Sequence, residues 1–379
     1  MMSQGSKREL LETIRPRYRK ASKKDKQRIL DEFVAVTGYH RKYAIRILRS
    51  EEHKEHRKKP GPRKIYQGEV VTALEYIWEI CGQICSRRLH PFLPEIVKVL
   101  ERNHEIHLTP ETKKLLLQMS RSSIDRCLSS ADHARPHGLS TTKPGTLLKK
   151  SIPVRIYTPW DEEKPGFMEI DLVAHCGDTT EGQFVNTLTS VDIATGWIEC
   201  QAVFPRNRHT VLEAIKTMQA RLPFALLGLD SDNGGEFINE MLLQFCQFQK
   251  ITFTRSRPYH KNDQAHVEQK NWSVVRHLVG YDRFETISEY NLLQSIYADL
   301  SLYSNFFQPV LKLTSKEVVD GRVIKHYDTA ATPYQRVLAS ILIPFEVKAR
   351  LTNLYVRLNP VDLRNSIDRK VHQLCSLSR

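Results

Sequence analysis

The stretch LDSDNGGEF, from Leu229 to Phe237, decides how the second half of the chain is expected to fold. It closes an apolar run with two aspartates, Asp230 and Asp232, and continues with Asn-Gly-Gly. An apolar run of this kind is typical of a buried strand, and Asn-Gly-Gly allows the backbone to turn tightly. We therefore expect a strand that brings carboxylates out of the core, a turn beside them, and a helix beginning at Glu236.

The residues around this stretch alternate between strand and helix patterns. Three apolar segments come first and predict a meander of strands, after which helical and strand patterns alternate. The expected strands are 166–175, 183–194, 196–204, 223–230 and 251–256, and the expected helices are 209–222, 236–249 and 263–280. This order predicts a mixed α/β sheet covered by helices.

Acidic side chains fall at comparable places in several of these elements. Asp171 ends the apolar run of the first strand, and Glu268 lies in the first turns of the last helix. Side chains at strand ends tend to gather in α/β sheets, and gathered carboxylates repel one another unless a cation neutralises them. Because hard oxygen ligands favour Mg²⁺ or Mn²⁺, we expect a divalent-metal site. Asp230 and Asp232 point to the same side of an extended strand, so the pattern alone does not choose between them.

Three ordered motifs in this region resemble those of one known superfamily. They are EIDLV with Asp171, SDNGGEF with Asp232, and RPYHKNDQAHVEQKN with Glu268, which lies 36 residues beyond Asp232. Together they resemble the integrase core of the DDE transposases and retroviral integrases, a group that includes bacterial insertion-sequence transposases. The resemblance spans residues 160–285 and implies a ribonuclease H-like catalytic core. It also implies that the aspartate directly before Asn-Gly, Asp232, is the metal ligand, and that Asp230 either supports that ligand or has a structural role.

The resemblance implies metal-dependent phosphoryl transfer on DNA, catalysed by Asp171, Asp232 and Glu268. Two Mg²⁺ or Mn²⁺ ions are implied: one bridged by Asp171 and Asp232 to activate water or a DNA 3′-hydroxyl, the other held by Asp171 and Glu268 to stabilise the leaving oxygen. A transposase of this kind cleaves DNA at the terminal sequences of its element and joins those ends to target DNA. A metal nuclease of the same fold and an inactive, transposase-derived DNA-binding regulator are the alternatives.

Positive charge is concentrated in the N-terminal part of the chain. The formal net charge is +14; residues 1–150 hold 32 Lys and Arg against 17 Asp and Glu, whereas residues 151–379 hold 25 against 26. Clustered cations favour polyanions because each contact with a phosphate releases condensed counterions. We therefore expect the N-terminal part to bind DNA, although a solvated basic surface explains the same distribution.

Residues 1–60 are expected to form a helix-turn-helix DNA-binding domain followed by a basic linker. Ser22 and Asp25 form a capping pattern, apolar residues follow at helical spacing, and Thr37-Gly38 breaks that spacing. A second amphipathic helix with a basic outer face comes next. The DNA contacts expected on it are Arg41, Lys42 and Arg46. Any small helical hairpin with a charged face has a similar pattern.

A second helical helix-turn-helix domain is expected over residues 65–131, followed by a linker over 132–159. Ser120 is placed to cap a helix in which Ile124 and Leu128 face inward. The outward face of this helix holds two further residues expected to contact DNA, Arg121 and Arg126.

Further DNA contacts are expected around the acidic residues of the core. The basic, aromatic loop 255–262 and the residues that follow Glu268 are suited to phosphate groups, although ordinary solvated charge explains them equally well. The candidates are Arg255, Lys261, Lys270 and Asn271. The remaining region, 286–379, is expected to be helical and to support assembly.

Other features concern compartment and assembly. The sequence has no run of about 18 apolar residues and no signal segment, and its cysteines are scattered rather than arranged as a disulfide framework. We therefore expect a cytoplasmic, nucleoid-associated protein without membrane contact. Because a mobile element has two ends and each core has one acidic triad, we expect at least a homodimer on DNA.

A histidine and cysteine pattern, His53-x-x-His56 followed by Cys81-x-x-x-Cys85, resembles the spacing of zinc ligands. The histidines lie in a charged linker, and the cysteines lie on one apolar helix face, where cysteine is commonly a small core residue. Zinc binding is therefore the less favoured interpretation.

Overall fold

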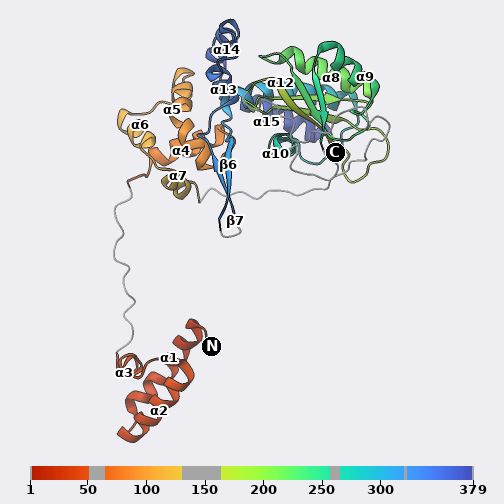
Figure 1. The fold of residues 1–379 in the computed structure, drawn as a ribbon. Coiled ribbons are helices and arrows are strands. Elements are labelled where there is room, and N and C mark those ends of the chain that lie inside the picture. Colours follow the sequence, from red (N-terminus) through yellow and green to blue (C-terminus); the bar gives the residue numbers. More distant parts are fainter. Residues whose placement is uncertain (1, 51–64, 130–163, 257–264, 320–321, 378–379) are drawn as a thin grey trace. The chain divides into compact units, whose positions relative to one another are not determined.

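Figure 1 shows the computed structural model of the chain, in which two compact units are distinguished, Met1–Ile65 and Tyr66–Arg379. The residues that the structure describes are 2–50, 65–129, 164–256, 265–319 and 322–377. The predicted linker residues 51–60 and 132–159, the two histidines of the zinc pattern, and Lys261 lie outside the described residues. The two units have separate apolar cores.

The N-terminal unit consists of three helices, α1 (Gln4–Lys20), α2 (Lys23–Thr37) and α3 (Arg41–Arg49). Ser22 caps α2 by accepting a hydrogen bond from the Asp25 amide, and Gly38 ends α2 in the left-handed conformation at φ 69°. Phe33 of α2 and Leu48 of α3 are fully buried in the core between the helices. The two helices and the turn predicted here are present, and α1, which the sequence patterns do not predict, completes their core.

Four helices open the larger unit: α4 (Glu69–Ile80), α5 (Ser86–Arg102), α6 (Pro110–Leu117) and α7 (Arg121–Leu128). At the start of α7 the Ser120 side chain accepts a hydrogen bond from the Ser123 amide, which confirms the predicted cap. Ile124 and Leu128 are buried, as predicted, so the opposite face of α7 is the one exposed.

A five-stranded sheet forms the centre of the larger unit. Its strands are β1 (Phe167–Ala174), β2 (Asn186–Asp192), β3 (Ile198–Val203), β4 (Gly228–Ser231) and β5 (Thr252–Arg255). They lie in the order β3-β2-β1-β4-β5. The first three pair antiparallel as a meander, whereas β4 pairs parallel with both β1 and β5. The predicted mixed α/β sheet is therefore confirmed, with β1 at its middle.

Helices cover both faces of this sheet. Successive residues of β1 point to opposite faces, so they pack in two different apolar cores. Met168, Ile170 and Leu172 pack in the core formed with α8 (Arg208–Arg221) and α9 (Glu240–Gln249), two helices that lie near each other in Figure 1. Val173 belongs to the core on the other face, where α12 (Ile287–Phe307) packs against β3. By the same alternation, the acidic residues of β1 share the face of Val173.

Two element boundaries differ from the sequence prediction. α9 begins at Glu240 rather than Glu236, because the Asn239 side chain caps it by accepting from the Leu242 amide at 3.0 Å. The last helix of the core is also not uniform: α10 (Ala265–Lys270) passes into a π-helical segment, η1 (Asn271–Arg276), and then into α11 (His277–Val279). Such π-helical turns occur frequently at functional sites.

The C-terminal region is only partly helical, which corrects the sequence prediction. The strands β6 (Leu313–Val319) and β7 (Arg322–Tyr327) form an antiparallel hairpin, and α13 (Pro333–Ala339), α14 (Phe345–Arg357) and α15 (Pro360–Leu377) follow. Alternating residues on both sides of Asp320-Gly321 are a hairpin signal that the sequence contains.

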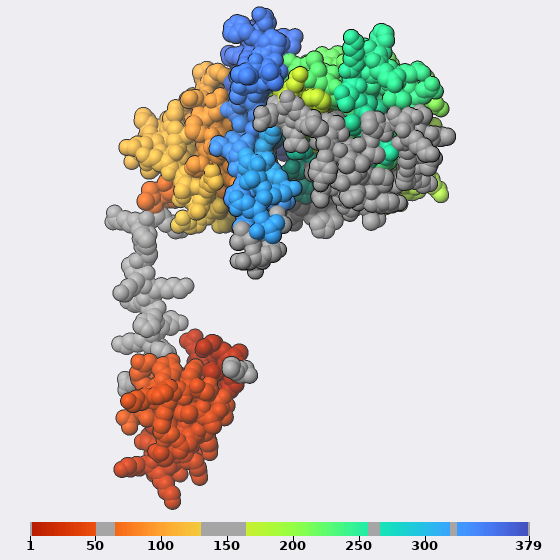
Figure 2. Space-filling model, viewed as in Figure 1, coloured from red at the N-terminus to blue at the C-terminus, as the bar shows by residue number. Residues whose placement is uncertain are grey.

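The C-terminal helices share one apolar core with α4–α7 and with the α12 face of the sheet. Arg102 of α5 donates to the Tyr355 and Leu358 carbonyls at 3.2 and 3.4 Å, and the Tyr355 hydroxyl donates to Glu95 at 2.5 Å. Figure 2 shows the C-terminal segment, in blue, between α4–α7 in orange and yellow and the sheet region in green. In the described part of the chain, every helix is too short or too polar to cross a membrane.

Candidate active site

The Asp171 carboxylate is held by groups from two elements. The Leu172 amide of β1 donates to its Oδ1 at 2.8 Å, and Nδ2 of Asn271, the first residue of η1, donates to its Oδ2 at 2.6 Å. Each carboxylate oxygen therefore has a donor, and the orientation of the carboxylate is set by the protein itself. Asp171 is half-buried, so the group remains accessible at the end of the strand.

The Asp232 carboxylate is fixed by the turn that follows β4. The Gly234 amide donates to Asp232 Oδ1 at 2.8 Å. A Cβ atom at position 234 would lie 2.9 Å from that oxygen and 2.8 Å from the Glu236 carboxylate, closer than real Cβ contacts allow. Glycine at this position therefore permits the two carboxylates to approach the backbone, which is the role the Asn-Gly-Gly sequence has in the folded chain.

The structure separates the two aspartates that the strand pattern left equivalent. Asp230 is fully buried within β4 and accepts a hydrogen bond from the Thr254 hydroxyl of β5. Asp232 lies beyond the end of β4 at Ser231, is half-buried, and is held by the turn instead. Strand β4 ends between Asp230 and Asp232, so the alternation of side chains along a strand does not apply to this pair. Of the two carboxylates, only that of Asp232 is accessible.

Electrostatic effects indicate that four carboxylates lie near one another. Burial raises the pKa of Asp171 to about 8, with further increases from the charges of Asp232, Glu268 and Glu236; the Leu172 amide acts in the opposite direction. Burial and the charge of Glu236 also raise the pKa of Asp232, against the Gly234 amide and the Arg206 guanidinium. The three predicted acids, from β1, the turn after β4, and α10, therefore share one electrostatic environment.

These carboxylates are not closed around a metal-sized space. Among the described residues, no group of three or more His, Cys, Asp or Glu side chains lies in a geometry that holds a metal ion. Glu268 is exposed on α10, whereas Asp171 and Asp232 are half-buried. The donor chemistry fits a hard divalent cation, since carboxylate oxygens repel one another without one.

Glu169 is a buried acid that sequence analysis does not identify. Its side chain is 1% exposed, and its Oε2 accepts hydrogen bonds from the His266 and Val267 amides, each at 3.0 Å. These amides are in the first turn of α10, the helix that positions Glu268. Glu169 thus fixes the start of α10 against β1. Its one sequence signal is a charged residue within an apolar strand, at the same alternation as Asp171.

Glu236 is a second acid that was not predicted as part of the site. Its side chain is 10% exposed and pairs with Arg206, which precedes α8. Because it also acts on the pKa of both Asp171 and Asp232, it adds negative charge to the site while Arg206 partly compensates it. The sequence prediction placed Glu236 at the start of a helix, which obscured this contact.

Two predicted DNA contacts of the core bond to other residues of the chain, and a third lines a cavity. Arg255 is 8% exposed and donates to Asn233 Oδ1 at 2.8 Å, so it supports the turn rather than facing solvent. Asn271 is bonded to Asp171. Lys270 lies on another side of the same helix and lines a cavity, where burial and the Arg88 guanidinium lower its pKa to about 7. Local sequence did not reveal these partners because they lie far away along the chain.

The candidate DNA contacts of the helical regions are on exposed surfaces. Lys42 and Arg46 are exposed on α3, where the Arg46 guanidinium lies 5.0 Å from the Tyr43 ring centroid. Arg41, at the start of α3, pairs with Asp31 of α2. Arg121 and Arg126 are exposed on α7. These positions are accessible to a ligand, and their contact with DNA remains a prediction.

One histidine, His175, and the two cysteines of the zinc pattern lie in separate environments. His175 is fully buried beside the Thr187 hydroxyl, and burial lowers its pKa to about 3. Cys81, the residue after α4, is buried in the apolar core, whereas Cys85, the residue before α5, is exposed. The two cysteines therefore face different surroundings, which gives no support to a shared zinc ion.

The sequence of this chain is similar to one known protein family and to a bacterial protein. The family described as "Integrase core domain" matches residues 161–261, a range that includes Asp171 and Asp232 and ends before Glu268. The chain is 41% identical over 344 residues to the "Uncharacterized protein y4rM" of Sinorhizobium fredii (strain NBRC 101917 / NGR234), covering 88% of this chain and 96% of that protein.

More distant relatives include viral proteins. The chain is 29% identical over 116 residues to the "Pro-Pol polyprotein" of Feline foamy virus, covering 30% of this chain and 10% of that polyprotein. Among solved structures, the HTLV-2 integrase catalytic core domain in complex with magnesium (dimeric form) is similar at a TM-score of 0.29 and 15% identity, covering 38% of this chain and 90% of that one.

Proposed function

The chain belongs to the family that includes y4rM and contains an integrase core domain with a ribonuclease H-like α/β fold, and from this premise we propose that it is a DNA transposase. Integrase cores are metal-dependent polynucleotidyl transferases. The observation that supports the proposal is the electrostatic coupling of three acids from separate elements: burial raises the pKa of Asp171, and the charges of Asp232 and Glu268 raise it further. Gathered acids of this kind are more common at functional sites than in structural cores.

The proposed catalytic and metal-binding residues are Asp171, Asp232 and Glu268. When bound, two Mg²⁺ or Mn²⁺ ions would supply Lewis-acid activation of the attacking hydroxyl and stabilisation of the leaving oxygen. The protein holds two of these acids in place: Asn271 orients Asp171, and the Gly234 amide orients Asp232. Glu169 fixes the start of the helix that bears Glu268.

DNA recognition is proposed for the N-terminal regions. The charge surplus of residues 1–150 supplies the electrostatic attraction, and exposed basic residues on α3 and α7 supply candidate phosphate contacts. The proposed ligands are the terminal sequences of the element and the target DNA. Because one chain has one acidic triad and an element has two ends, we propose at least a dimer on DNA.

The proposal is tested by an assay of strand transfer. The full-length chain is incubated with Mg²⁺, a target plasmid and labelled oligonucleotides that carry the ends of the neighbouring element. We expect cleavage at the element end and covalent joining to the plasmid, both lost in EDTA. Cleavage without joining would identify a nuclease, and sequence-specific binding without any chemistry would identify a DNA-binding regulator.

A further inference from the structure

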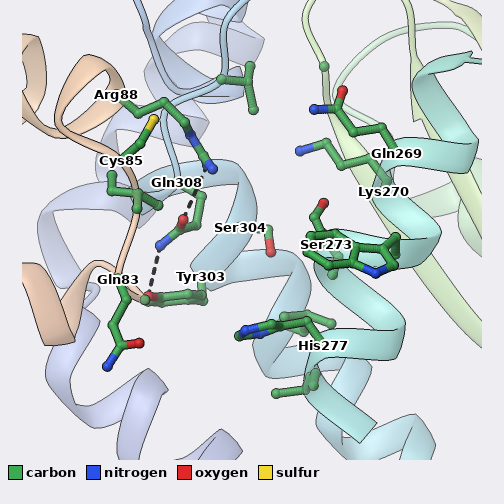
Figure 3. Close-up of a pocket in the computed structure, with 18 of the residues that line it drawn as sticks. Gln83, Cys85, Arg88, Gln269, Lys270, Ser273, His277, Tyr303, Ser304 and Gln308 are labelled. Carbon is green, nitrogen blue, oxygen red and sulfur yellow. Dashed lines mark hydrogen bonds between the residues drawn. The ribbon is translucent and has the colours of Figure 1, made fainter. Parts of the chain in front are cut away.

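A cavity of about 910 Å³ lies on another side of α10 and η1, within the larger unit. Its walls include α4, α5 and their connection, the end of β2, α10 with η1, the end of α12 with the segment that follows it, the hairpin strand β7, and α15. Figure 3 shows this cavity with its lining side chains. The helical block therefore meets the catalytic core around an open space rather than around packed side chains alone.

Two cations face each other across this cavity. Figure 3 shows the Arg88 side chain, from α5, and the Lys270 side chain, from α10, extending toward one another. Arg88 Nε donates to the Pro309 carbonyl at 2.6 Å, and one of its terminal nitrogens lies 3.4 Å from Gln308 Oε1. For the Lys270 ammonium, the described residues provide neither a hydrogen bond nor an ion pair.

The other charged groups of the lining do not neutralise this pair. Arg364 and Asp368 pair with each other at 2.8 Å, and Lys312 donates to the Ala194 carbonyl at 2.9 Å. The remaining carboxylate among the described lining residues, Glu79, is exposed. The described lining thus places no buried, unpaired carboxylate opposite Arg88 and Lys270, so a bound anion would meet no repulsion there and would favour the charged form of the Lys270 ammonium.

The helix that carries the acids places this charge by its own periodicity. Lys270, Ser273 and His277 follow one another at helical spacing and line the cavity. Glu268 and Asn271, three residues apart, lie toward Asp171 instead. The α10–η1 segment therefore has an acidic side and a cationic side. A group bound in the cavity would be separated from the proposed catalytic carboxylates by the width of this helix.

We propose that this cavity binds a phosphate group, supplied by a strand of the DNA substrate next to the strand that is cut. Arg88 and Lys270 provide the charge, and the Ser273 and Gln269 side chains provide neutral polar contacts in the same lining. Trp272 also lines the cavity and is 54% exposed, so its ring is available to stack on a base beside the phosphate. The choice of a DNA strand rests on the proposed function; the choice of phosphate rests on the cavity alone.

Binding is measured on the full-length chain in EDTA, so that the acidic site takes no part through metal. The probes are a labelled single-stranded 10-mer, followed by fluorescence anisotropy, and inorganic pyrophosphate, followed by its effect on the melting temperature. The variants are Lys270→Gln, Lys270→Arg and, as a matched loss of one surface charge, Lys216→Gln on α8, where Lys216 pairs with Glu213.

We expect Lys270→Gln to weaken binding of the 10-mer roughly tenfold, since one charge-assisted contact is lost. The slope of log affinity against log salt should fall by about 0.7, the value for one phosphate contact on a single strand. Lys270→Arg and Lys216→Gln should remain within about twofold of the unchanged protein. Ser273→Asp, which places a carboxylate in the cavity while retaining Lys270, should also weaken binding and guards against a folding defect in the first variant.

Each outcome decides the proposal. Lysine-dependent binding of the 10-mer supports the DNA strand as the phosphate source, and lysine-dependent stabilisation by pyrophosphate alone supports a phosphate site filled by a small polyphosphate. Equal binding of both probes by Lys270→Gln and the unchanged protein would overturn the cavity proposal. Metal-dependent strand transfer by the unchanged protein is measured separately, so failure of the cavity and failure of the transposase proposal are distinguishable.

Discussion

The acidic and cationic sides of the α10–η1 segment form two regions of opposite character. On the acidic side, Asn271 donates to Asp171, and the charge of Glu268 acts on the same carboxylate. On the cationic side, Lys270 faces Arg88 across a cavity. Adjacent residues, Lys270 and Asn271, therefore belong to different environments, because neighbours along a helix point about 100° apart.

Position along the chain is therefore a poor guide to the role of a residue within the α10–η1 segment. Residues on the acidic side contact the groups proposed for chemistry, so substitutions there should change the rate of reaction more than DNA affinity. Residues on the cationic side contact a space suited to phosphate, so substitutions there should change affinity more than rate. The Lys270 measurements test the expectation for the cationic side, and substitutions of the acidic residues test the expectation for the acidic side.

The largest effect is expected from Asp232→Asn. Loss of a proposed metal ligand should remove several kcal/mol of transition-state stabilisation, and each 1.36 kcal/mol is tenfold in rate, so Mg²⁺-dependent cleavage should fall about 10³-fold. DNA affinity in EDTA should stay within about twofold, because the helical regions are unchanged.

The control for that variant is Asp230→Asn, which alters a buried carboxylate bonded to Thr254. Its cleavage rate should remain within about tenfold of the unchanged protein, the lower end of the range for residues that support a metal ligand. Equal loss of cleavage in both variants would contradict the assignment of Asp232 as the ligand, and so would a greater loss in Asp230→Asn.

A smaller effect is expected from Glu169→Ala. The change leaves the His266 and Val267 amides without their buried acceptor and loosens the start of α10. Cleavage should fall roughly 10- to 100-fold, as for other residues that position metal ligands, and a higher Mg²⁺ concentration should restore part of the rate.

Glu169→Gln is the matched variant for this position, since it keeps one oxygen acceptor and removes the charge. It should retain more activity than Glu169→Ala and should require less additional Mg²⁺. A Glu169→Ala protein with normal cleavage at limiting Mg²⁺ would show that the start of α10 does not control the acidic side.

A few-fold effect is expected from Arg46→Ala in the N-terminal unit. Arg46 is exposed on α3, so its loss should lower affinity for terminal duplex DNA about threefold and reduce the salt slope by about 0.9. Single-turnover cleavage at saturating DNA should be unchanged. Gel-shift titration over a salt series measures the affinity, and an unchanged slope would remove Arg46 from the set of phosphate contacts.

The smallest effect concerns metal binding and pH. Burial, followed by the charge of Asp232, raises the pKa of Asp171 from 3.8 to about 8. The folded protein therefore holds a proton that the unfolded chain releases, and this contribution to stability is lost as pH rises from about 4 through about 8. Because Mg²⁺ replaces that proton, its gain in melting temperature should be larger at pH 8.5 than at pH 6, by a few degrees.

Differential scanning fluorimetry with and without Mg²⁺ measures this gain at each pH. Glu268→Gln should reduce the gain at pH 8.5, because one of the proposed ligands loses its charge. An equal Mg²⁺-dependent gain in melting temperature at both pH values would show that metal binding does not depend on the protonation of Asp171. No gain in melting temperature at either pH would contradict a metal site on the acidic side.

Local patterns in the sequence predict much of this fold. The strands of the sheet, the Ser22 and Ser120 caps, and the turn after Asp232 depend on residues within a few positions of one another. The β6–β7 hairpin also had a local signal in the alternating residues of its two strands, which the expectation of a helical C-terminal region did not take into account.

Long-range contacts explain what the sequence did not predict. Glu169 acts on amides 97 and 98 residues away, and Asn271 acts on a carboxylate 100 residues away. Arg255 carries the positive charge expected of a DNA contact, but its side chain is buried against the turn at Asn233. Charge and spacing along the sequence show that such residues are polar and where they fall within an element. The partner that decides the role of each residue depends on how the elements pack against one another.

The division of the apolar cores has a consequence for how chains of this kind diversify. Helices α1–α3 enclose a core of their own, so we expect a segment that ends near residue 65 to fold without the rest and to be exchangeable between related genes as one module. Helices α4–α7 share their core with the C-terminal helices, through contacts such as Arg102 to Tyr355, and a swap there would leave both partners incomplete. New binding preferences are therefore expected to be acquired by exchange at the N-terminal unit and by gradual substitution elsewhere.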